Sequence, residues 1–192
     1  MPSIRIISGA YGGRKIEAPS TDNRRIHPMG ERIRNAVFNS LGARLDGAKV
    51  LDAFAGTGAV GLEALSRGAR SAVFIEKDRI AQKILAANVE TLGAASRAKL
   101  VKTSVSKWCE TYDGPEFSLI FADPPYYDPQ GSSVARLSET LADDGMMIVS
   151  WPEKEASLVI EGLDSIDERV YAGAKIIFYQ KQKLSTASKK DF

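Results

Sequence analysis

The fold is decided by residues 50–61, V-L-D-A-F-A-G-T-G-A-V-G, in which a short apolar run leads directly into closely spaced glycines. Gly56, Gly58 and Gly61 match the spacing G-x-G-x-x-G, and Glu76 follows roughly 20 residues later at the end of another apolar run. Between a strand and a helix, such glycines let the backbone approach a nucleotide-like ligand, and the acid accepts hydrogen bonds from ribose hydroxyls. The stretch therefore predicts an adenosine-binding loop.

Strands and helices alternate along the chain from this loop onward. Strands are expected at 50–54, 72–76, 99–102, 117–122 and 146–151, and helices at 59–67, 78–92, 105–111, 133–142 and 153–161. The alternation predicts an α/β protein with a doubly wound, mostly parallel sheet and right-handed crossovers. Residues 166–171 and 174–180 are expected to add a C-terminal antiparallel hairpin, which brings the sheet to seven strands.

The segment before this sheet has a different pattern. Two short strands around 4–8 and 15–18 and a helix at 29–44 are expected there. A chain of 192 residues is long enough for one well-buried domain with an appendage. We therefore expect a small N-terminal β/α extension at 1–48, a main domain at 49–182 and a polar tail at 183–192.

Composition restricts the kinds of chemistry that are available. The net charge is only +2, so the chain as a whole does not indicate a nucleic-acid partner. No apolar run is long enough to span a membrane and no signal peptide is visible, which predicts a cytoplasmic protein, expected to be a monomer. A single cysteine, Cys109, and a single histidine, His27, exclude disulfides, iron–sulfur clusters and multi-histidine metal sites. We expect no metal.

A second motif, Asp123-Pro124-Pro125-Tyr126, follows the apolar run 117–122. Each proline favours an extended conformation of the residue before it, so the Asp123 carboxylate and the Pro124 carbonyl can converge as hydrogen-bond acceptors. The Tyr126 ring can stack on a flat substrate beside them. The motif therefore predicts a site that acts on a planar amino group; the alternative is a proline-rich turn after a core strand.

The charge of Asp52 bears on which ligand the glycine loop takes. A carboxylate just before the loop would repel a pyrophosphate but attract the ammonium and sulfonium groups of S-adenosylmethionine. In a doubly wound sheet the ends of strands 50–54 and 117–122 are neighbours, so the two motifs should face each other across a cleft. An NAD-dependent oxidoreductase and a non-catalytic nucleotide-binding module remain alternatives, although NAD chemistry gives the 123–126 motif no role.

The residues at 52–69, Glu76 and 117–126 resemble those of class I S-adenosylmethionine-dependent methyltransferases, which have a Rossmann-like sheet. Further matches, R-I-I-S-G at 5–9, G-R-K-I at 13–16 and P-M-G-E-R-I-R-N-A-V-F-N at 28–39, resemble the RsmD family. That family methylates the N2 amine of guanine in small-subunit ribosomal RNA. The resemblance covers roughly residues 4–182 and implies the same activity here.

The resemblance also implies a set of cofactor contacts, namely Asp52, Phe54, Ala55, Gly56, Thr57, Gly58, Glu76, Lys77, Ser104, Val105 and Asp123. Two departures from the family pattern stand out. Met29-Gly30 replaces a pair of threonines, and Ser104-Val105 replaces the aspartate that usually contacts adenine. Adenine would then be recognised through Ser104 or through the backbone.

Catalysis is assigned to Asp123, Pro124 and Tyr126. The lone pair of an exocyclic amine on a nucleobase is delocalised into the ring, and acceptors on both N–H bonds favour a pyramidal, more nucleophilic nitrogen. Tyr126 would stack on a base extruded from its helix. An adenine-N6 methyltransferase acting on DNA or RNA is the nearest alternative, since Asp123 favours guanine only by family resemblance.

Basic residues are concentrated before residue 45, with eight lysines and arginines against three acidic residues. This segment suits a phosphate-binding flap over the cleft, for ribosomal RNA either free or in an assembled small subunit; an ordinary solvated surface is the alternative. The predicted RNA contacts are Arg24, Arg25, His27, Arg32, Arg34 and Tyr127. For His27 a polar loop residue is favoured over an acid–base catalyst, and Tyr127 could extend the stacking surface or simply pack.

Overall fold

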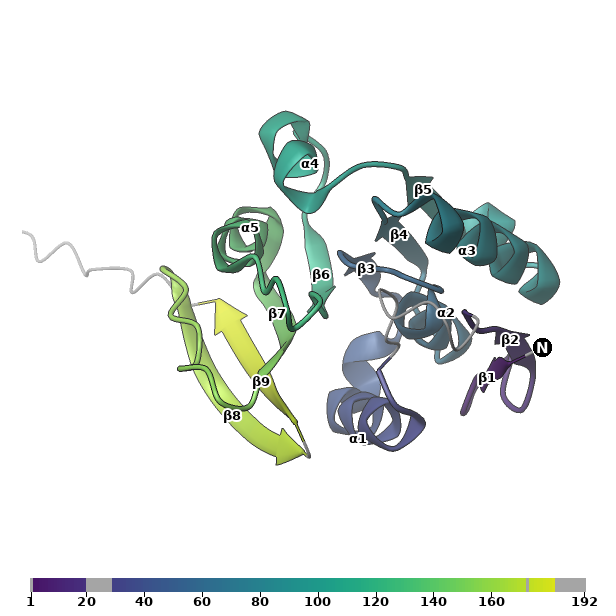
Figure 1. The fold of residues 1–192 in the computed structure, drawn as a ribbon, viewed down its shortest axis with the longest axis horizontal. Coiled ribbons are helices and arrows are strands. Elements are labelled where there is room, and N and C mark those ends of the chain that lie inside the picture. The colour runs from purple at the N-terminus through teal and green to yellow at the C-terminus, as the bar shows by residue number, and fades with distance from the viewer. Residues whose placement is uncertain (1, 20–28, 172, 182–192) are drawn as a thin grey trace, which may run out of the picture.

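The computed structural model describes residues 2–19, 29–171 and 173–181, and its main feature is a seven-stranded sheet with the order β5-β4-β3-β6-β7-β9-β8 (Figure 1). The five strands from β5 to β7 run parallel, whereas β9 pairs antiparallel with both β7 and β8. The predicted mostly parallel sheet with a C-terminal hairpin is confirmed. Its strands are β3 (Lys49–Asp52), β4 (Ser71–Ile75), β5 (Ala98–Val101), β6 (Phe117–Ala122), β7 (Leu141–Pro152), β8 (Leu163–Tyr171) and β9 (Ala174–Lys181).

Helices cover both faces of this sheet, and successive strand residues alternate between two apolar clusters. Val50 of β3 belongs to a cluster with α1, α2 and α3, and the next residue, Leu51, belongs to a cluster with α4 and α5. The helices are α1 (Glu31–Leu41), α2 (Ala59–Ser66), α3 (Arg79–Leu92), α4 (Val105–Thr111) and α5 (Gly131–Arg136). Over the described ranges, none of them has the length and apolar character that a membrane span requires.

Two predicted helices are shorter than expected and one does not form. The helix expected at 29–44 divides into α1 and the 3-10 helix η1 (Gly42–Leu45). The helix expected at 133–142 divides into α5 and the 3-10 helix η3 (Leu137–Thr140), and the next residue, Leu141, begins β7. The helix expected at 153–161 is wrong, because this segment is a turn followed by irregular backbone.

Side chains of neighbouring strands hold the backbone of this irregular segment. The indole nitrogen of Trp151 donates to the carbonyl of Ala156 over 3.0 Å, and the Tyr179 hydroxyl donates to the carbonyl of Leu158. These tertiary bonds use carbonyl groups that a helix would have needed, and they bring Ile160 into the second apolar cluster. Packing therefore overrides the local helical pattern.

The N-terminal segment forms its own two-stranded antiparallel sheet, β1 (Ser3–Arg5) with β2 (Lys15–Glu17), at the opposite end of the molecule from β8 (Figure 1). Its apolar residues Ile6 and Ile16 are buried in the same cluster as Val37, Phe38 and Leu41 of α1. The segment is therefore packed onto the main sheet through a shared core.

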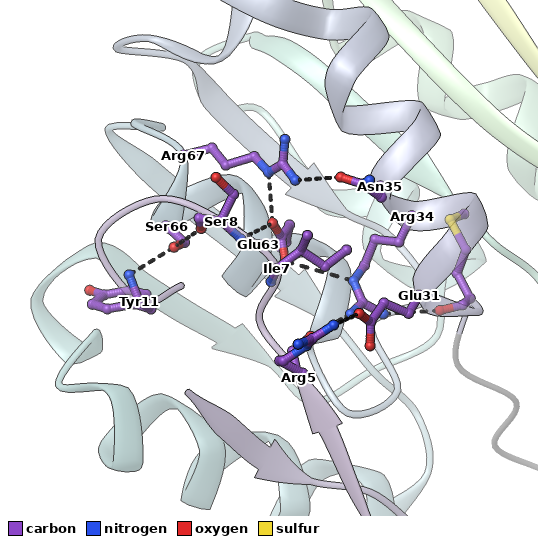
Figure 2. Close-up of polar contacts among 12 residues, drawn as sticks. Arg5, Ile7, Ser8, Tyr11, Glu31, Arg34, Asn35, Glu63, Ser66 and Arg67 are labelled. Carbon is purple, nitrogen blue, oxygen red and sulfur yellow. Dashed lines mark hydrogen bonds and ion pairs between the residues drawn. The ribbon is translucent and has the colours of Figure 1, made fainter. Parts of the chain in front are cut away.

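A buried carboxylate, Glu63 on α2, attaches this segment to the rest of the molecule (Figure 2). It accepts hydrogen bonds from the backbone N–H groups of Ile7, over 2.7 Å, and Ser8, over 3.1 Å. It also pairs with the guanidinium groups of Arg67, at 2.6 Å, and Arg34, at 3.8 Å. Removal of a carboxylate from water is costly unless it is paired and hydrogen-bonded, and four partners meet that requirement here.

Candidate active site

A cavity of about 880 Å³ opens at the carboxyl ends of β3, β4 and β6. In the strand order β4-β3-β6, β3 begins one half of the sheet and β6 belongs to the other, so the cavity lies at the switch point where ligands bind in doubly wound sheets. Both predicted motifs line it. Of the predicted site residues, the lining contains Asp52, Phe54, Ala55, Gly56, Thr57, Glu76, Lys77, Ser104, Val105, Asp123, Pro124, Tyr126 and Tyr127.

The glycines of the loop have different structural roles. Gly56 lines the cavity with a φ of 53°, whereas Gly58 lies at the start of α2 with a φ of 81° and is not among the cavity-lining residues. A Cβ on Gly58 would lie 2.3 Å from Cδ1 of Leu85, and a Cβ on Gly61 would lie 2.3 Å from the ring of Phe74. Gly58 and Gly61 therefore let α2 approach α3 and the sheet, and Gly56 leaves the loop backbone open to a ligand.

Three carboxylates, Asp52, Glu76 and Asp123, face the cavity from adjacent strands. Burial raises the pKa of Asp52 to about 7; a hydrogen bond from the N–H of Gly61, at 2.9 Å, opposes the rise, and the charges of Asp123 and Glu76 add to it. Burial likewise raises the pKa of Asp123 to about 6. Like charges close to one another disfavour each other's ionised form, so the site is arranged to accept a cationic ligand.

Glu76 is oriented by backbone donors. One of its carboxylate oxygens accepts from the N–H of Gly56 and the other from the N–H of Asp78, both over 2.7 Å. Each oxygen keeps a second lone pair, so the side chain can still accept from a pair of hydroxyls. The acid is thus fixed against the glycine loop.

The Asp123-Pro124-Pro125-Tyr126 turn leaves the sheet beside β7. Ala122, the last residue of β6, is in register with Val149, so Asp123 continues the strand next to Ser150. The Tyr126 hydroxyl lies 2.6 Å from the Ser150 hydroxyl, and the Tyr126 side chain remains 42% exposed. Tyr127 is 70% exposed and lines the cavity, so it is not a core residue.

The start of α4 forms part of the cavity wall through Ser104 and Val105. The Ser104 hydroxyl oxygen accepts from the N–H of Lys107 over 3.3 Å and caps the helix. The following N–H group, that of Val105, is in the first turn, where helix geometry offers no acceptor. The Ser104 side chain thus has a local role, and the backbone donor at Val105 stays available to a ligand.

Several cavity residues were not found by sequence reasoning. Met29, Gly30 and Ile33 belong to the stretch 28–39, whose likeness to a family motif was a signal that it contributes to a site. Ser150 is a single hydroxyl within the apolar run 146–151, and such an interruption of a buried strand indicates a bonded polar group. Gln130 also lines the cavity, and its φ of 50° is unusual for a residue with a side chain.

The prediction that Arg34 contacts RNA is wrong. Its side chain is 1% exposed, and it donates to the carbonyl of Met29 over 3.0 Å and to that of Arg5 over 2.6 Å, in addition to its ion pair with Glu63. The basic excess before residue 45 is therefore partly structural, since Arg5 pairs with Glu31 and Arg14 donates to the carbonyls of Thr91 and Leu92. Arg32 is exposed, and the remaining candidates Arg24, Arg25 and His27 lie outside the described residues.

The strand order, the glycine loop with Glu76 and the acidic Pro-Pro turn define a class of protein, the S-adenosylmethionine-dependent methyltransferases with a Rossmann-like sheet. Solved structures agree. "Putative methyltransferase yhhF" from Escherichia coli matches with a TM-score of 0.84 and 31% identity, over 94% of this chain and 99% of that chain. The hypothetical protein TTHA0928 from Thermus thermophilus matches with a TM-score of 0.79 and 28% identity, over 92% and 99%.

Sequence comparison narrows the class to one family. A family model described as conserved hypothetical protein 95 matches residues 4–180. Ribosomal RNA small subunit methyltransferase D of Escherichia coli K12 is 37% identical over 149 residues, which are 76% of this chain and 73% of that protein. The protein of the same name from Buchnera aphidicola (subsp. Acyrthosiphon pisum) is 29% identical over 158 residues, 82% and 77% of the two chains. This chain belongs to the RsmD family.

Proposed function

We propose that this protein transfers the methyl group of S-adenosylmethionine to the exocyclic N2 amine of a guanine in small-subunit ribosomal RNA. One observation carries the proposal: the acceptor pair Asp123 and Pro124 lines the same cavity as the glycine loop and Glu76. Residues suited to hold a planar amine and residues suited to hold an adenosine cofactor thus share one cavity. The names of the RsmD relatives supply the class of substrate.

The residues present fit S-adenosylmethionine. Its ammonium and sulfonium charges suit a cavity with the carboxylates Asp52 and Asp123, and its ribose suits the oriented Glu76. The buried hydroxyl of Thr57 has no hydrogen-bond partner within the described ranges, as expected of a group that forms its hydrogen bond with a ligand. When bound, S-adenosylmethionine supplies an electrophilic methyl group. Adenine recognition is assigned to the backbone at Val105, with Phe54, Ala55 and Lys77 beside it in the lining.

Asp123 and Pro124 prepare the nucleophile. The carboxylate and the prolyl carbonyl accept hydrogen bonds from the two N–H groups of the amine. These bonds direct the nitrogen lone pair away from the two acceptors and toward the methyl donor. With a pKa of about 6, Asp123 is mostly ionised at neutral pH and can also take the proton that the amine loses. Most of the rate enhancement then comes from alignment of the reacting groups.

Tyr126 provides the surface on which the target base stacks. Its ring is part of the cavity wall and is about half exposed, while its hydroxyl is held by Ser150. Extrusion of a base costs a few kcal/mol, and stacking on an aromatic ring returns roughly 1–3 kcal/mol. Tyr127, exposed next to it, extends this surface toward the RNA.

The N-terminal residues up to 48 form the RNA-facing part of the molecule. Phosphate contacts are assigned to Arg24, Arg25, His27 and the exposed Arg32. The segment also supplies Met29, Gly30 and Ile33 to the cavity wall, so RNA bound along it would lie next to the reaction site. The substrate is ribosomal RNA, either free or within the small subunit, and the enzyme acts as a monomer.

Transfer of tritium from labelled S-adenosylmethionine tests this proposal. Deproteinised small-subunit RNA, small ribosomal subunits and double-stranded DNA are offered separately, and the labelled polymer is digested to nucleosides. We expect label in N2-methylguanosine from RNA or from subunits. Label in N6-methyladenosine would replace guanine by adenine as the target, and absence of label from every polymer, with cofactor binding intact, would overturn the proposal.

A further inference from the structure

Ser150 is a buried polar residue on β7 that the proposed reaction does not yet use. Its side chain is 2% exposed and lines the cavity, within a strand whose preceding residues, Met146, Met147, Ile148 and Val149, are all buried and apolar. A hydroxyl in such a strand is costly unless it is hydrogen-bonded. Its presence therefore requires an explanation in terms of its partners.

Both partners of Ser150 belong to the catalytic turn. Parallel pairing of β6 with β7 sets Asp123 beside Ser150, and the serine hydroxyl opposes the rise of the pKa of the Asp123 carboxyl group. The Tyr126 hydroxyl lies 2.6 Å from the oxygen of the same serine. One hydroxyl thus joins the acceptor of the reaction to the ring proposed to stack on the base.

The number of available protons sets the direction of the hydrogen bonds between Asp123, Ser150 and Tyr126. An ionised carboxylate can only accept, so in a bond between the two side chains the single proton of Ser150 is donated to Asp123. The serine oxygen then accepts from Tyr126, whose hydroxyl is the remaining donor. The bond to an ionised acceptor is the stronger of the two, and each bond polarises the other in the same sense.

We propose that Ser150 is a positioning residue for methyl transfer, which fixes the Asp123 carboxylate and the Tyr126 ring relative to each other through one hydrogen-bonded chain. The inference rests on the proposed function. Without this link the carboxylate would be free to rotate, and the ring, which is 42% exposed, would lose the hydrogen bond that ties it to β7. Misplacement of reacting groups by about 1 Å can cost a hundredfold in rate.

Other ionisable groups share the cavity with Asp123 and have to stay constant in any test. Asp52 on β3 and Glu76 after β4 share the cavity, and both carry negative charge when ionised. A cation bound in the cavity would oppose these charges. Among the residues that the structure describes, the remaining ionisable groups in the cavity lining are Lys77, Asp78, Tyr126 and Tyr127. Of these groups only Tyr126 bonds to Ser150, and Tyr126→Phe removes that bond separately. A larger change in the pKa of Asp123 in Ser150→Ala than in Tyr126→Phe therefore reports the serine itself.

Carbon-detected NMR of the Asp123 carboxyl group in the cofactor-free protein gives a readout that needs no RNA. The resonance is assigned with Asp123→Asn and titrated in wild type, Ser150→Ala, Tyr126→Phe and Ser165→Ala. Ser165 is an exposed serine on β8 and is the matched control. We expect Ser150→Ala to raise the pKa of Asp123 by about one pH unit, Tyr126→Phe to change it less, and Ser165→Ala to leave it unchanged.

Single-turnover methyl transfer by the same proteins at saturating cofactor completes the test. We expect Ser150→Ala to reduce the rate about tenfold with the KM for S-adenosylmethionine unchanged. An unchanged pKa of Asp123 in Ser150→Ala would overturn the inference, and so would a wild-type rate. If wild type itself fails to methylate guanine, the proposed function falls while the carboxyl titration still decides the role of Ser150. Should Ser150→Ala not fold, a wild-type rate of methyl transfer by Tyr126→Phe would overturn the inference.

Discussion

At the scale of single residues, the cavity concentrates negative charge where a cation is proposed to bind. Asp52, with a pKa of about 7, and Asp123, with a pKa of about 6, are each partly protonated near neutral pH in the free protein because burial disfavours their charged forms. A bound ammonium or sulfonium group favours the ionised forms and lowers both pKa values. Binding of the cofactor therefore has to release protons.

The first prediction is that affinity for S-adenosylmethionine falls as the pH is lowered through the range of about 7 to about 6. The ionised carboxylates bind the cation, so each linked proton can change the affinity by up to about tenfold per pH unit. Isothermal titration calorimetry in buffers of different ionisation enthalpy measures both the affinity and the protons released. An affinity that is constant across this range would show that these carboxylates do not contact the cation.

The second prediction concerns Arg34, whose role is structural. Replacement with methionine removes two bonds to backbone carbonyls and one partner of the buried Glu63, so we expect Arg34→Met to lower the free energy of unfolding by about 3 kcal/mol. Arg32→Met, at an exposed arginine on the same helix, should change it by about 0.5 kcal/mol or less. Urea unfolding measures both. Equal stability of the two variants would contradict the role assigned to the Glu63 cluster.

A finer reading of the helix pattern could have found this role. Arg34, Val37, Phe38 and Leu41 follow the spacing i, i+3, i+4, i+7 of one helical face, and all four are buried. Sequence reasoning named Arg34 with Arg32 as an RNA contact, although side chains two residues apart on a helix diverge. The partner that makes burial tolerable, Glu63, lies 29 residues away, and only the packed structure brings it to the arginine.

At the scale of elements, alternation of strands and helices correctly predicted the five parallel strands of the main sheet, because buried parallel strands leave continuous apolar runs. The irregular segment after β7 was not predictable in this way. Its carbonyl groups are bonded by Trp151 and Tyr179, and Tyr179 comes from a strand that follows later in the chain. The cavity motifs were found for the opposite reason: each is contiguous in sequence and lies at the end of a strand.

The third prediction concerns the attachment of the N-terminal sheet to α2. Gly9 has a φ of 84°, and a Cβ there would lie 1.9 Å from the carbonyl oxygen of Ser66. Gly13 has a φ of 81°, with nothing within 4 Å of such a Cβ, and is the matched control. Gly13→Ala should cost about 1–2 kcal/mol of stability from backbone strain alone. Gly9→Ala should cost about 1–3 kcal/mol more, because α2 has to move.

Hydrogen exchange distinguishes strain from detachment in these variants. The N–H groups of Ala10 and Tyr11 bond to the backbone and side chain of Ser66, so they should exchange faster in Gly9→Ala than in Gly13→Ala. Equal exchange and equal stability of the two variants would contradict close contact between this segment and α2.

At the scale of the whole molecule, the N-terminal segment has two connected roles. It is packed into the core through Ile6 and Ile16, and it contributes Met29, Gly30 and Ile33 to the cavity. Some of its basic residues, such as Arg34, form bonds within the protein, and others, such as Arg32, lie at the surface. RNA that contacts the surface residues would be held next to the cavity, because Glu63 attaches this segment to α2.

The fourth prediction follows from this arrangement. Reversal of Arg24 and Arg25 to glutamate should weaken binding to small-subunit RNA and reduce the slope of log affinity against log salt, with cofactor affinity unchanged. The reduction should be about 0.7–0.9 for each phosphate that the variant no longer neutralises. Arg70→Glu, a reversal at an exposed residue before the amino end of β4, is the control and should leave the slope as it is. Fluorescence anisotropy at several salt concentrations measures the slopes. Identical slopes in wild type and the double variant would remove these arginines from the interface.

The most direct test of the whole account is the single-turnover rate of Asp123→Ala at saturating cofactor and RNA, beside Asp128→Ala, which removes an exposed carboxylate from the same loop. The account predicts a rate at least about a hundredfold lower for Asp123→Ala, with S-adenosylmethionine still bound, and a wild-type rate for Asp128→Ala. A near-normal rate for Asp123→Ala would contradict the claim that this carboxylate holds the reacting amine.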